Sequence, residues 1–99
     1  MASVRWSAAA LDDLDAIGEY VGRASPVYAR SLVARLYSAA AALAEYPGLG
    51  RAVPEVEVEH VREIVREGYR LVYLVSGDGV DVLAVLHGRQ DLGRKLRRG

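Results

Sequence analysis

Arg70 and His87 are the two side chains in this sequence best placed to do chemistry, because each adjoins a long apolar run in which polar residues are rare. A guanidinium such as that of Arg70 can hold a carboxylate or a phosphate. The imidazole of His87 has a reference pKa of about 6.5, so it can take up or release a proton near neutral pH. The structural alternatives are that Arg70 pairs with a carboxylate on the sheet and that His87 is a satisfied histidine at a strand end.

The segments around these residues predict a β-hairpin at the centre of a sheet. Apolar residues dominate positions 69–75 and 80–86, which flank the sequence Ser76-Gly77-Asp78-Gly79. Val, Leu and Tyr favour strands, while Gly and Asp supply the positive φ angles of a tight turn. Both runs are apolar at odd and even positions alike, so we expect both faces of the hairpin to be largely covered.

The register of this hairpin decides whether the two candidates meet. A loop of two or four residues would pair Val75 with Val80, and therefore Arg70 with Val85. Opposed residues share a face, so Arg70 and His87 would then be diagonal neighbours on one face. A three-residue loop would separate them, so the expectation depends on the register.

Two helices are predicted before the hairpin. A short strand at 3–7 leads to a first helix that Ser7 caps. Ser25 and Pro26 start a second helix over 26–46. The break between the helices is short, so we expect an antiparallel helical hairpin.

The remaining segments complete an α+β fold. Residues 51–55 read as a loop, because Pro54 argues against a central strand. The latter part of 56–66 reads as a strand that turns into the hairpin. The predicted order is β-α-α-β-β-β, with the helical hairpin on one face of a mainly antiparallel four-stranded sheet. The opposite face is expected to be an open concave surface carrying Arg70, His87 and Arg89.

Length and composition limit the class of protein. Ninety-nine residues make a single domain, 1–99, and 52% hydrophobic with 26% charged residues is typical of a folded globule. No apolar run approaches the ~20 residues of a membrane span, and the N-terminus lacks the apolar core of a signal peptide. We therefore expect a cytoplasmic protein with no membrane partner. Cysteine is absent, which excludes disulfides.

Charge is balanced overall but unevenly placed. The net charge is zero, yet the C-terminal tail, about 90–99, is basic and the segment 55–59 contains three glutamates. We expect residues 93–99 to be exposed and to add binding charge, not core. The tail cations are Arg94, Lys95, Arg97 and Arg98.

Three aspartates, Asp12, Asp13 and Asp15, cluster in the first helix. A metal site is one interpretation of such a cluster. A solvated helix face that suits the helix dipole is the interpretation we favour. We therefore predict no metal and no cofactor.

Short motifs along nearly the whole chain resemble one known family. They are Trp6-Ser7, Asp13-Leu14, Tyr46-Pro47 with Gly50-Arg51, Val53-Pro54-Glu55, Arg62-Glu63, Tyr69-Arg70-Leu71-Val72-Tyr73 and Leu86-His87-Gly88-Arg89. In this order they resemble the RelE/ParE superfamily, the toxins of bacterial type II toxin–antitoxin modules. The resemblance implies a cognate antitoxin protein as partner and a hetero-oligomer with it.

The resemblance implies two possible targets. RelE-like members cut messenger RNA on the ribosome without a metal, and ParE-like members poison DNA gyrase without cutting anything themselves. In a RelE-like enzyme, Arg70 would stabilise the phosphate and His87 would be the acid/base group. Arg51, Arg62, Arg66 and Arg89 would add contacts to the nucleic acid or other target.

We favour gyrase poisoning over RNA cleavage. Lys95 is the only lysine and the net charge is zero, whereas ribosome binding draws on basic surface. The tail has no aromatic residue, and residues 87–92 resemble the ending of ParE-like members. A degenerate, non-toxic member that acts only as a binding module is a further alternative.

Overall fold

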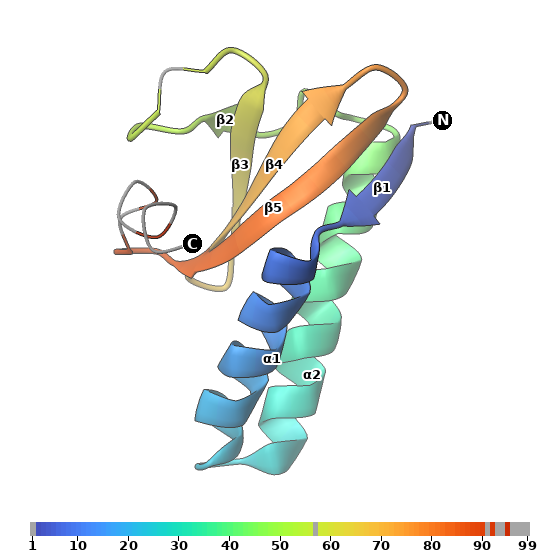
Figure 1. Cartoon of the computed structure of the whole chain (residues 1–99). Coiled ribbons are helices and arrows are strands. Elements are labelled where there is room, and N and C mark those ends of the chain that lie inside the picture. The colour runs from blue at the N-terminus through green and yellow to red at the C-terminus, as the bar shows by residue number, and fades with distance from the viewer. Residues whose placement is uncertain (1, 57, 91, 93–94, 96–99) are drawn as a thin grey trace.

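The fold consists of a helical hairpin packed on one face of a mixed five-stranded sheet (Figure 1). The computed structural model describes residues 2–56, 58–90, 92 and 95. In chain order the elements are β1 (Ser3–Trp6), α1 (Ala8–Gly22), α2 (Pro26–Ala39), the 3₁₀ helix η1 (Ala40–Ala44), β2 (Arg51–Ala52), β3 (Val61–Arg66), β4 (Tyr69–Ser76) and β5 (Gly79–His87). The strand order is β1-β5-β4-β3-β2.

This architecture confirms the predicted α+β class, with one more strand than expected. Arg51 and Ala52, predicted as loop, pair antiparallel with Glu63 and Arg62 at one edge of the sheet. At the other edge β1 runs parallel to β5. The sheet is therefore mainly antiparallel, as predicted, but five-stranded.

The helix starts follow from local sequence. The Ser7 hydroxyl accepts a hydrogen bond from the Ala10 N–H at 3.0 Å, and the Ser25 hydroxyl accepts one from the Tyr28 N–H at 3.1 Å. Both serines are therefore N-caps, as the sequence indicated. The second helix is shorter than predicted, because after Ala39 it tightens into the 3₁₀ turn of η1.

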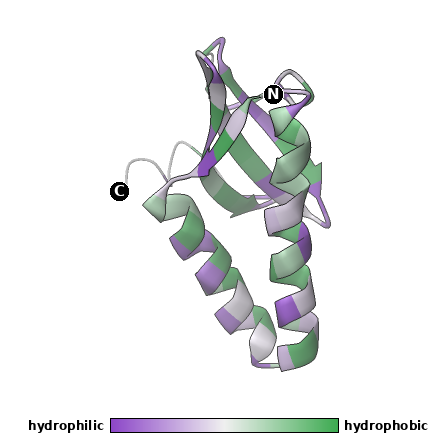
Figure 2. Cartoon of the chain, turned by 90° about the vertical axis from the view of Figure 1, so that its right-hand side faces the viewer, coloured by the Kyte–Doolittle hydropathy of each residue, from purple (hydrophilic) through white to green (hydrophobic). Residues whose placement is uncertain are grey.

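The sheet is covered on both faces, each with its own apolar core. The larger core lies between the helices and the sheet and centres on Leu14, Leu36, Leu71 and Tyr73. The smaller core lies on the opposite face. Its buried members are Val53, Val72, Ala84, Leu86 and Leu92. Figure 2 shows that both helices mix apolar and polar residues and extend past the sheet, so part of the helical hairpin has no strand beneath it.

The face opposite the helices is therefore not the open concave surface that was expected. The segment around Val53 and the side chain of Leu92 cover it, and Leu92 is only 2% exposed. Sequence periodicity could not show this, because the covering residues come from a loop and from the chain after the last strand. Residues 91, 93, 94 and 96–99 of the predicted tail lie outside the described residues.

One β-bulge determines which face of the sheet each side chain occupies at the open end of the hairpin. Val75 pairs with Val80 as predicted, but Val72 pairs with Ala84 and Tyr73 pairs with Val82, so Leu83 is an extra residue in β5. An extra residue on one strand changes which faces the following side chains share. Its backbone is held from the helical side, where the Ser7 hydroxyl donates to the Leu83 carbonyl at 3.3 Å.

The bulge overturns the predicted proximity of Arg70 and His87. Arg70 is opposite Leu86, not Val85, and His87 is opposite Tyr69. Successive side chains on a strand point to opposite faces. Arg70 therefore lies on the face of the smaller core, and His87 lies on the face of the helices.

Candidate functional site

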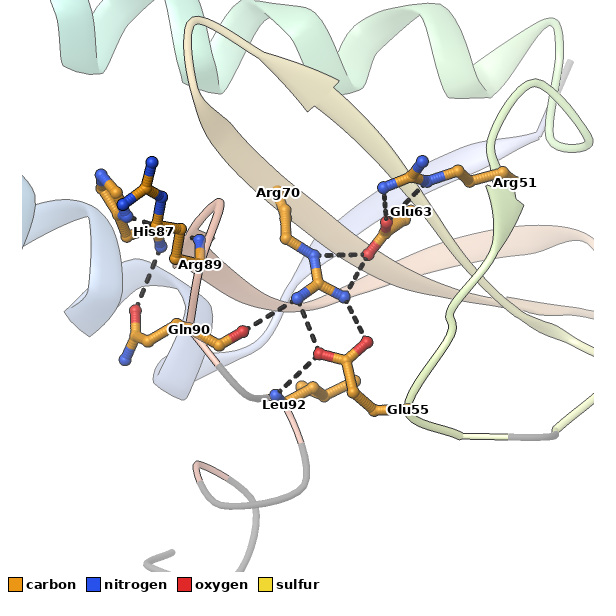
Figure 3. Close-up of polar contacts among 8 residues, drawn as sticks. All are labelled: Arg51, Glu55, Glu63, Arg70, His87, Arg89, Gln90 and Leu92. Carbon is orange, nitrogen blue, oxygen red and sulfur yellow. Dashed lines mark hydrogen bonds and ion pairs between the residues drawn. The ribbon is translucent and has the colours of Figure 1, made fainter.

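Arg70 is the centre of a buried ion cluster on the face opposite the helices (Figure 3). Arg70 as a whole residue is only 5% exposed. Glu63 Oε1 lies 2.7 Å from Nε and 2.6 Å from Nη2. The Glu55 carboxylate accepts from Nη1 and Nη2, both at 2.7 Å, and the Gln90 carbonyl accepts from Nη1 at 2.9 Å. These five contacts match the five N–H donors of a guanidinium, so all of them are in use.

The two glutamates reach Arg70 by different routes. Glu63 lies on β3 opposite Val72, so it shares a face with Arg70 as a diagonal neighbour. It is 1% exposed, and Oε2 also accepts from Arg51 Nε at 2.8 Å. Glu55 comes from the loop after β2 and also accepts the Leu92 N–H at 3.2 Å. The cluster therefore joins the sheet, the loop and the chain end.

The electrostatics of the cluster are mutually stabilising. The hydrogen bonds from Arg70 and from the Leu92 N–H lower the pKa of Glu55 from 4.5 to about 2. The hydrogen bonds that Arg70 donates to Glu55, and then those to Glu63, raise the pKa of Arg70 above its ordinary value. Two carboxylates and the cations of Arg70 and Arg51 balance each other, which a buried ion cluster needs.

His87 has a different environment from Arg70. It is exposed at the end of β5, and its ring meets Tyr69 edge-to-face with centroids 5.8 Å apart. Its Nδ1 faces the Arg89 N–H at 3.5 Å, at the long limit for a hydrogen bond. Figure 3 shows His87 and Arg89 apart from the Arg70 cluster. For Arg70, pairing with carboxylates on the sheet fits these contacts better than a catalytic site shared with His87. For His87, an exposed position at a strand end fits them better.

A small cavity of about 420 Å³ on the helical face contains His87 together with Asp13 of α1 and Lys95. Asp13 is not simply a solvated helix residue, which corrects the favoured interpretation of the aspartate cluster. Its Oδ2 accepts the Val85 N–H at 2.8 Å beside the bulge, and its Oδ1 lies 2.7 Å from Lys95 Nζ. The described residues contain no group of acidic, histidine or cysteine side chains arranged to hold a metal.

The other predicted contact residues are dispersed. Arg51 bonds Glu63. Arg62 donates to the Gly50 carbonyl and Arg66 to the Val65 carbonyl, each at 2.8 Å. Arg89 is exposed. Arg94, Arg97 and Arg98 lie outside the described residues.

The sequence analysis did not identify Glu55, Glu63 or Asp13 as residues that organise the site. Glu55 and Glu63 stood in quoted motifs, but only their pairing in space reveals them as the partners of Arg70. The available signal for Glu63 was its place on the same strand face as Val61 and Val65, where a lone carboxylate needs a cation. Asp13 had no signal beyond its motif, because its partners follow it by 72 and 82 residues in the chain.

The helical hairpin carries a second candidate site, an apolar groove of about 660 Å³ between α1 and α2. Its lining includes small residues, and a Cβ on Gly18 would lie 3.3 Å from Val33, so glycine allows the helices to approach. Asp15 of α1 and Arg30 of α2 place opposite charges along it. The lining also includes Leu11, Leu14, Gly22, Pro26, Ala29, Ala34 and Tyr37.

Comparison with known proteins assigns this fold to a family. Residues 4–92 match the family described as the ParE toxin of the type II toxin–antitoxin system, parDE. The chain is also similar to a solved structure described as the chromosomal ParDE TA system from P. aeruginosa, with a TM-score of 0.74 and 28% identity. That alignment covers 88% of this chain and 96% of the other.

Two curated relatives are similar along most of their length. One is the putative toxin Y4kP of Sinorhizobium fredii, 39% identical over 89 residues, which cover 88% of each chain. The other is Toxin RelE2 of Caulobacter vibrioides, 39% identical over 88 residues, which cover 88% of this chain and 96% of the relative. In the described part of the chain, no helix has both the length and the apolar character needed to cross a membrane.

Proposed function

Because this chain belongs to the ParE toxin family of type II toxin–antitoxin systems, we propose that it arrests growth by poisoning DNA gyrase. In this proposal the toxin acts by protein–protein recognition in the cytoplasm and catalyses no reaction of its own. The cognate antitoxin neutralises it by forming a hetero-oligomer.

The state of Arg70 is the observation that carries the choice of target. RNA cleavage without a metal requires a cation at the phosphate and an acid or base at the reacting oxygens. The Arg70 guanidinium already uses its donors on two carboxylates and a carbonyl. His87 is on the other face of the sheet. A chain that lacks this pairing is better suited to binding a target than to cutting RNA.

Purified toxin tests the proposal directly in two parallel reactions. One contains gyrase and supercoiled plasmid, and the other contains translating ribosomes and a labelled message. Cleaved plasmid complexes without message cleavage are the expected result. Codon-phased cleavage of the message would overturn the proposal, and activity in neither reaction would indicate another target or a non-toxic member.

RNA cleavage is the second candidate, since one relative of 39% identity is named Toxin RelE2. For this chain it would require Glu55 to leave Arg70, so that the guanidinium could accept a phosphate. The acid/base group would still have to act from the opposite face of the sheet. The two reactions above separate the candidates without any assumption about these movements.

The groove between α1 and α2 is the surface we assign to the antitoxin. It is mainly apolar, it runs along the hairpin from Leu11 and Tyr37 to Gly22 and Pro26, and its small residues leave room for a further helix. Asp15 and Arg30 favour an amphipathic helix with a cation on one side and a carboxylate on the other. These features fit a helical segment of the antitoxin.

Ala34→Glu tests this assignment, because Ala34 lines the groove and is exposed. The matched control is Ser38→Glu, on the same helix but outside the groove lining. Ala34→Glu should weaken antitoxin binding at least ~10-fold in a titration, while growth arrest persists and rescue by the antitoxin fails. Equal antitoxin affinity of the two variants would contradict the assignment.

A further inference from the structure

β3 extends past its neighbour β2 and leaves part of the sheet edge open. Arg51 and Ala52 of β2 are opposite Glu63 and Arg62, whereas β3 continues to Arg66. Figure 1 shows both strands at the side of the sheet away from β1. Within the part of the chain that the structure describes, no strand pairs with β3 beyond Glu63 on this side.

The alternation of backbone groups along β3 places those of Val65 at this open edge. The His60 carbonyl accepts the Val75 N–H of β4 at 2.9 Å, so the backbone groups of even-numbered residues here point toward β4. Those of Glu63 and Val65 therefore point the other way. In agreement, a Cβ on Gly50 would lie 2.5 Å from the Glu63 carbonyl oxygen. Val65 thus presents one N–H and one carbonyl, the two groups that a further strand would bond.

The chain before β2 leaves this position open because it turns away from β3. Leu49 would be opposite Val65 if β2 continued in register. Instead, the Leu49 N–H donates to the Tyr46 carbonyl at 3.0 Å, and the Gly50 N–H donates to the Tyr73 hydroxyl at 2.8 Å. A shallow notch of about 350 Å³ remains between residues 49–51 and 63–66. We call it the edge notch.

Two arginines and two apolar side chains line the edge notch. Arg66 Nη1 donates to the Val65 carbonyl at 2.8 Å, so a guanidinium occupies the open backbone acceptor in the free chain. None of the ion pairs among the described residues involves Arg66. Arg51 lines the notch from β2, and its side chain is 65% exposed. Leu49 and Val65 are 49% and 43% exposed, so the notch also has apolar walls.

We propose that the edge notch binds an extended, acidic segment of the toxin's protein target. The segment adds a short strand at Val65, and its N–H replaces the Arg66 guanidinium at the Val65 carbonyl. The released guanidinium then binds a carboxylate side chain of the same segment. Arg66 therefore covers the sheet edge in the free toxin and contacts the target in the complex.

The backbone and the charge of the edge notch argue for this occupant. A donor and an acceptor on one strand edge match a peptide backbone, whereas a phosphate has only acceptors for them. A second copy of this chain would bring its own Arg51 and Arg66 against these two, and like charges oppose such pairing.

The antitoxin is assigned to a different surface. Its groove between α1 and α2 shares no described lining residue with the edge notch. The edge notch is therefore a second surface, which a toxin that acts by recognition can use for its target. This inference rests on the proposed function, in which recognition and not catalysis produces toxicity.

Val65→Pro and Arg66→Gln test the two parts of the proposal separately. Proline removes the N–H at the open edge, leaves the bonds from β3 to β4 in place, and is tolerated in edge strands. Glutamine keeps a donor near the Val65 carbonyl but carries no charge. Arg23→Gln is the matched control, since Arg23 is an exposed arginine at the end of α1.

Each full-length variant is measured in three ways: plasmid cleavage with gyrase, growth arrest after induction, and antitoxin affinity. Val65→Pro and Arg66→Gln should each raise the toxin level needed for half-maximal growth arrest and plasmid cleavage about 10-fold. The control should match the unmodified chain. Antitoxin affinity should stay within about twofold in all variants, which a general loss of folding would not allow. Arg66→Gln keeps the inference testable if Val65→Pro fails to fold.

Unchanged plasmid cleavage and growth arrest in Arg66→Gln would overturn the inference and leave the proposed function intact. Weaker antitoxin binding with intact growth arrest would also overturn it, because the occupant would then be the antitoxin. Cleavage of a labelled message that Arg66→Gln weakens and Val65→Pro does not would mean that the edge notch binds phosphate. Growth arrest that needs both residues but occurs without plasmid cleavage would overturn gyrase as the target and support the edge notch.

Discussion

Arg70 and His87 belong to neighbouring residue pairs of the central hairpin, yet their side chains lie on opposite faces of the sheet. Arg70 is opposite Leu86 and His87 is opposite Tyr69, because Leu83 is an extra residue in β5. The guanidinium is enclosed by two carboxylates, and the imidazole is exposed beside α1. The two groups therefore have separate environments, and each can be tested by itself.

His87→Ala should change toxicity little. If the toxin acts by recognition, no single general base is required, and the concentration for half-maximal growth arrest should shift less than about 10-fold. Because His87 is exposed, the free energy of unfolding should change by under ~0.5 kcal/mol. A loss of about 10²–10⁴ in the rate of message cleavage, with ribosome binding intact, would instead identify His87 as the acid/base group of a nuclease.

Arg70→Ala should act through stability. Among the described residues it leaves buried Glu63 with only Arg51 as ionic partner and Glu55 with no cation, which costs on the order of 3–5 kcal/mol. Arg51→Ala is the control, because the Arg51 side chain is 65% exposed and Glu63 keeps Arg70; its cost should be under ~1 kcal/mol. Urea unfolding of both variants measures the difference. Similar stabilities with selective loss of message cleavage by Arg70→Ala would point to catalysis.

Tyr73→Phe should destabilise the fold by about 1–3 kcal/mol. The buried hydroxyl donates to the Pro47 carbonyl and accepts the Gly50 N–H, each at 2.8 Å. A Cβ on Gly50 would lie 2.5 Å from the Glu63 carbonyl oxygen, so the loop must approach the sheet closely there. Tyr37→Phe, at an exposed tyrosine, should be neutral in the same thermal melt. Equal melting temperatures would show that the loop does not depend on this hydroxyl.

The stabilising effect of Glu55 should disappear in acid. Its folded-state pKa is about 2 against an ordinary value of 4.5, so it contributes stability above pH 4.5 that is lost as the pH falls toward 2. The difference in unfolding free energy between the unmodified chain and Glu55→Gln should therefore be full near neutral pH and shrink through this range. A difference that stays constant down to pH 2 would mean that Glu55 is not held as a carboxylate by Arg70.

In the C-terminal segment, we expect Leu92 to contribute to stability and the residues after it to contribute to toxicity. Among the described contacts, deleting residues 93–99 removes the partly exposed ion pair Asp13–Lys95, and it should lower stability by under ~1 kcal/mol while reducing toxicity. Leu92→Ala removes a side chain that is 2% exposed and should cost about 2–5 kcal/mol. Melting temperatures and growth arrest of both variants distinguish them. A collapse in stability on deletion would show that the segment after Leu92 also belongs to the core.

Local signals in the sequence predicted most of the fold. The turn residues set the hairpin, with Val75 opposite Val80, and Ser7 and Ser25 were identified as caps from their own neighbours. These features depend on residues within one turn or one strand. The superfamily resemblance also rested on short local motifs, and the family match over residues 4–92 confirms it.

The site could not be predicted because it depends on contacts between distant residues. No propensity marks Leu83 as a bulge; it is stabilised by Ser7, 76 residues earlier in the chain. The short strand at Arg51 forms only because β3 offers it an edge. Glu55 stood in a segment that resembled an acidic loop, and it becomes the partner of Arg70 only when the loop folds over the sheet.

The most direct test of the central claim compares gyrase and ribosome targets with one preparation of the toxin. The account predicts that cleaved plasmid complexes accumulate with gyrase, that the labelled message stays intact on translating ribosomes, and that His87→Ala behaves as the unmodified chain in both reactions. Codon-phased cleavage of the message that His87→Ala abolishes would contradict it.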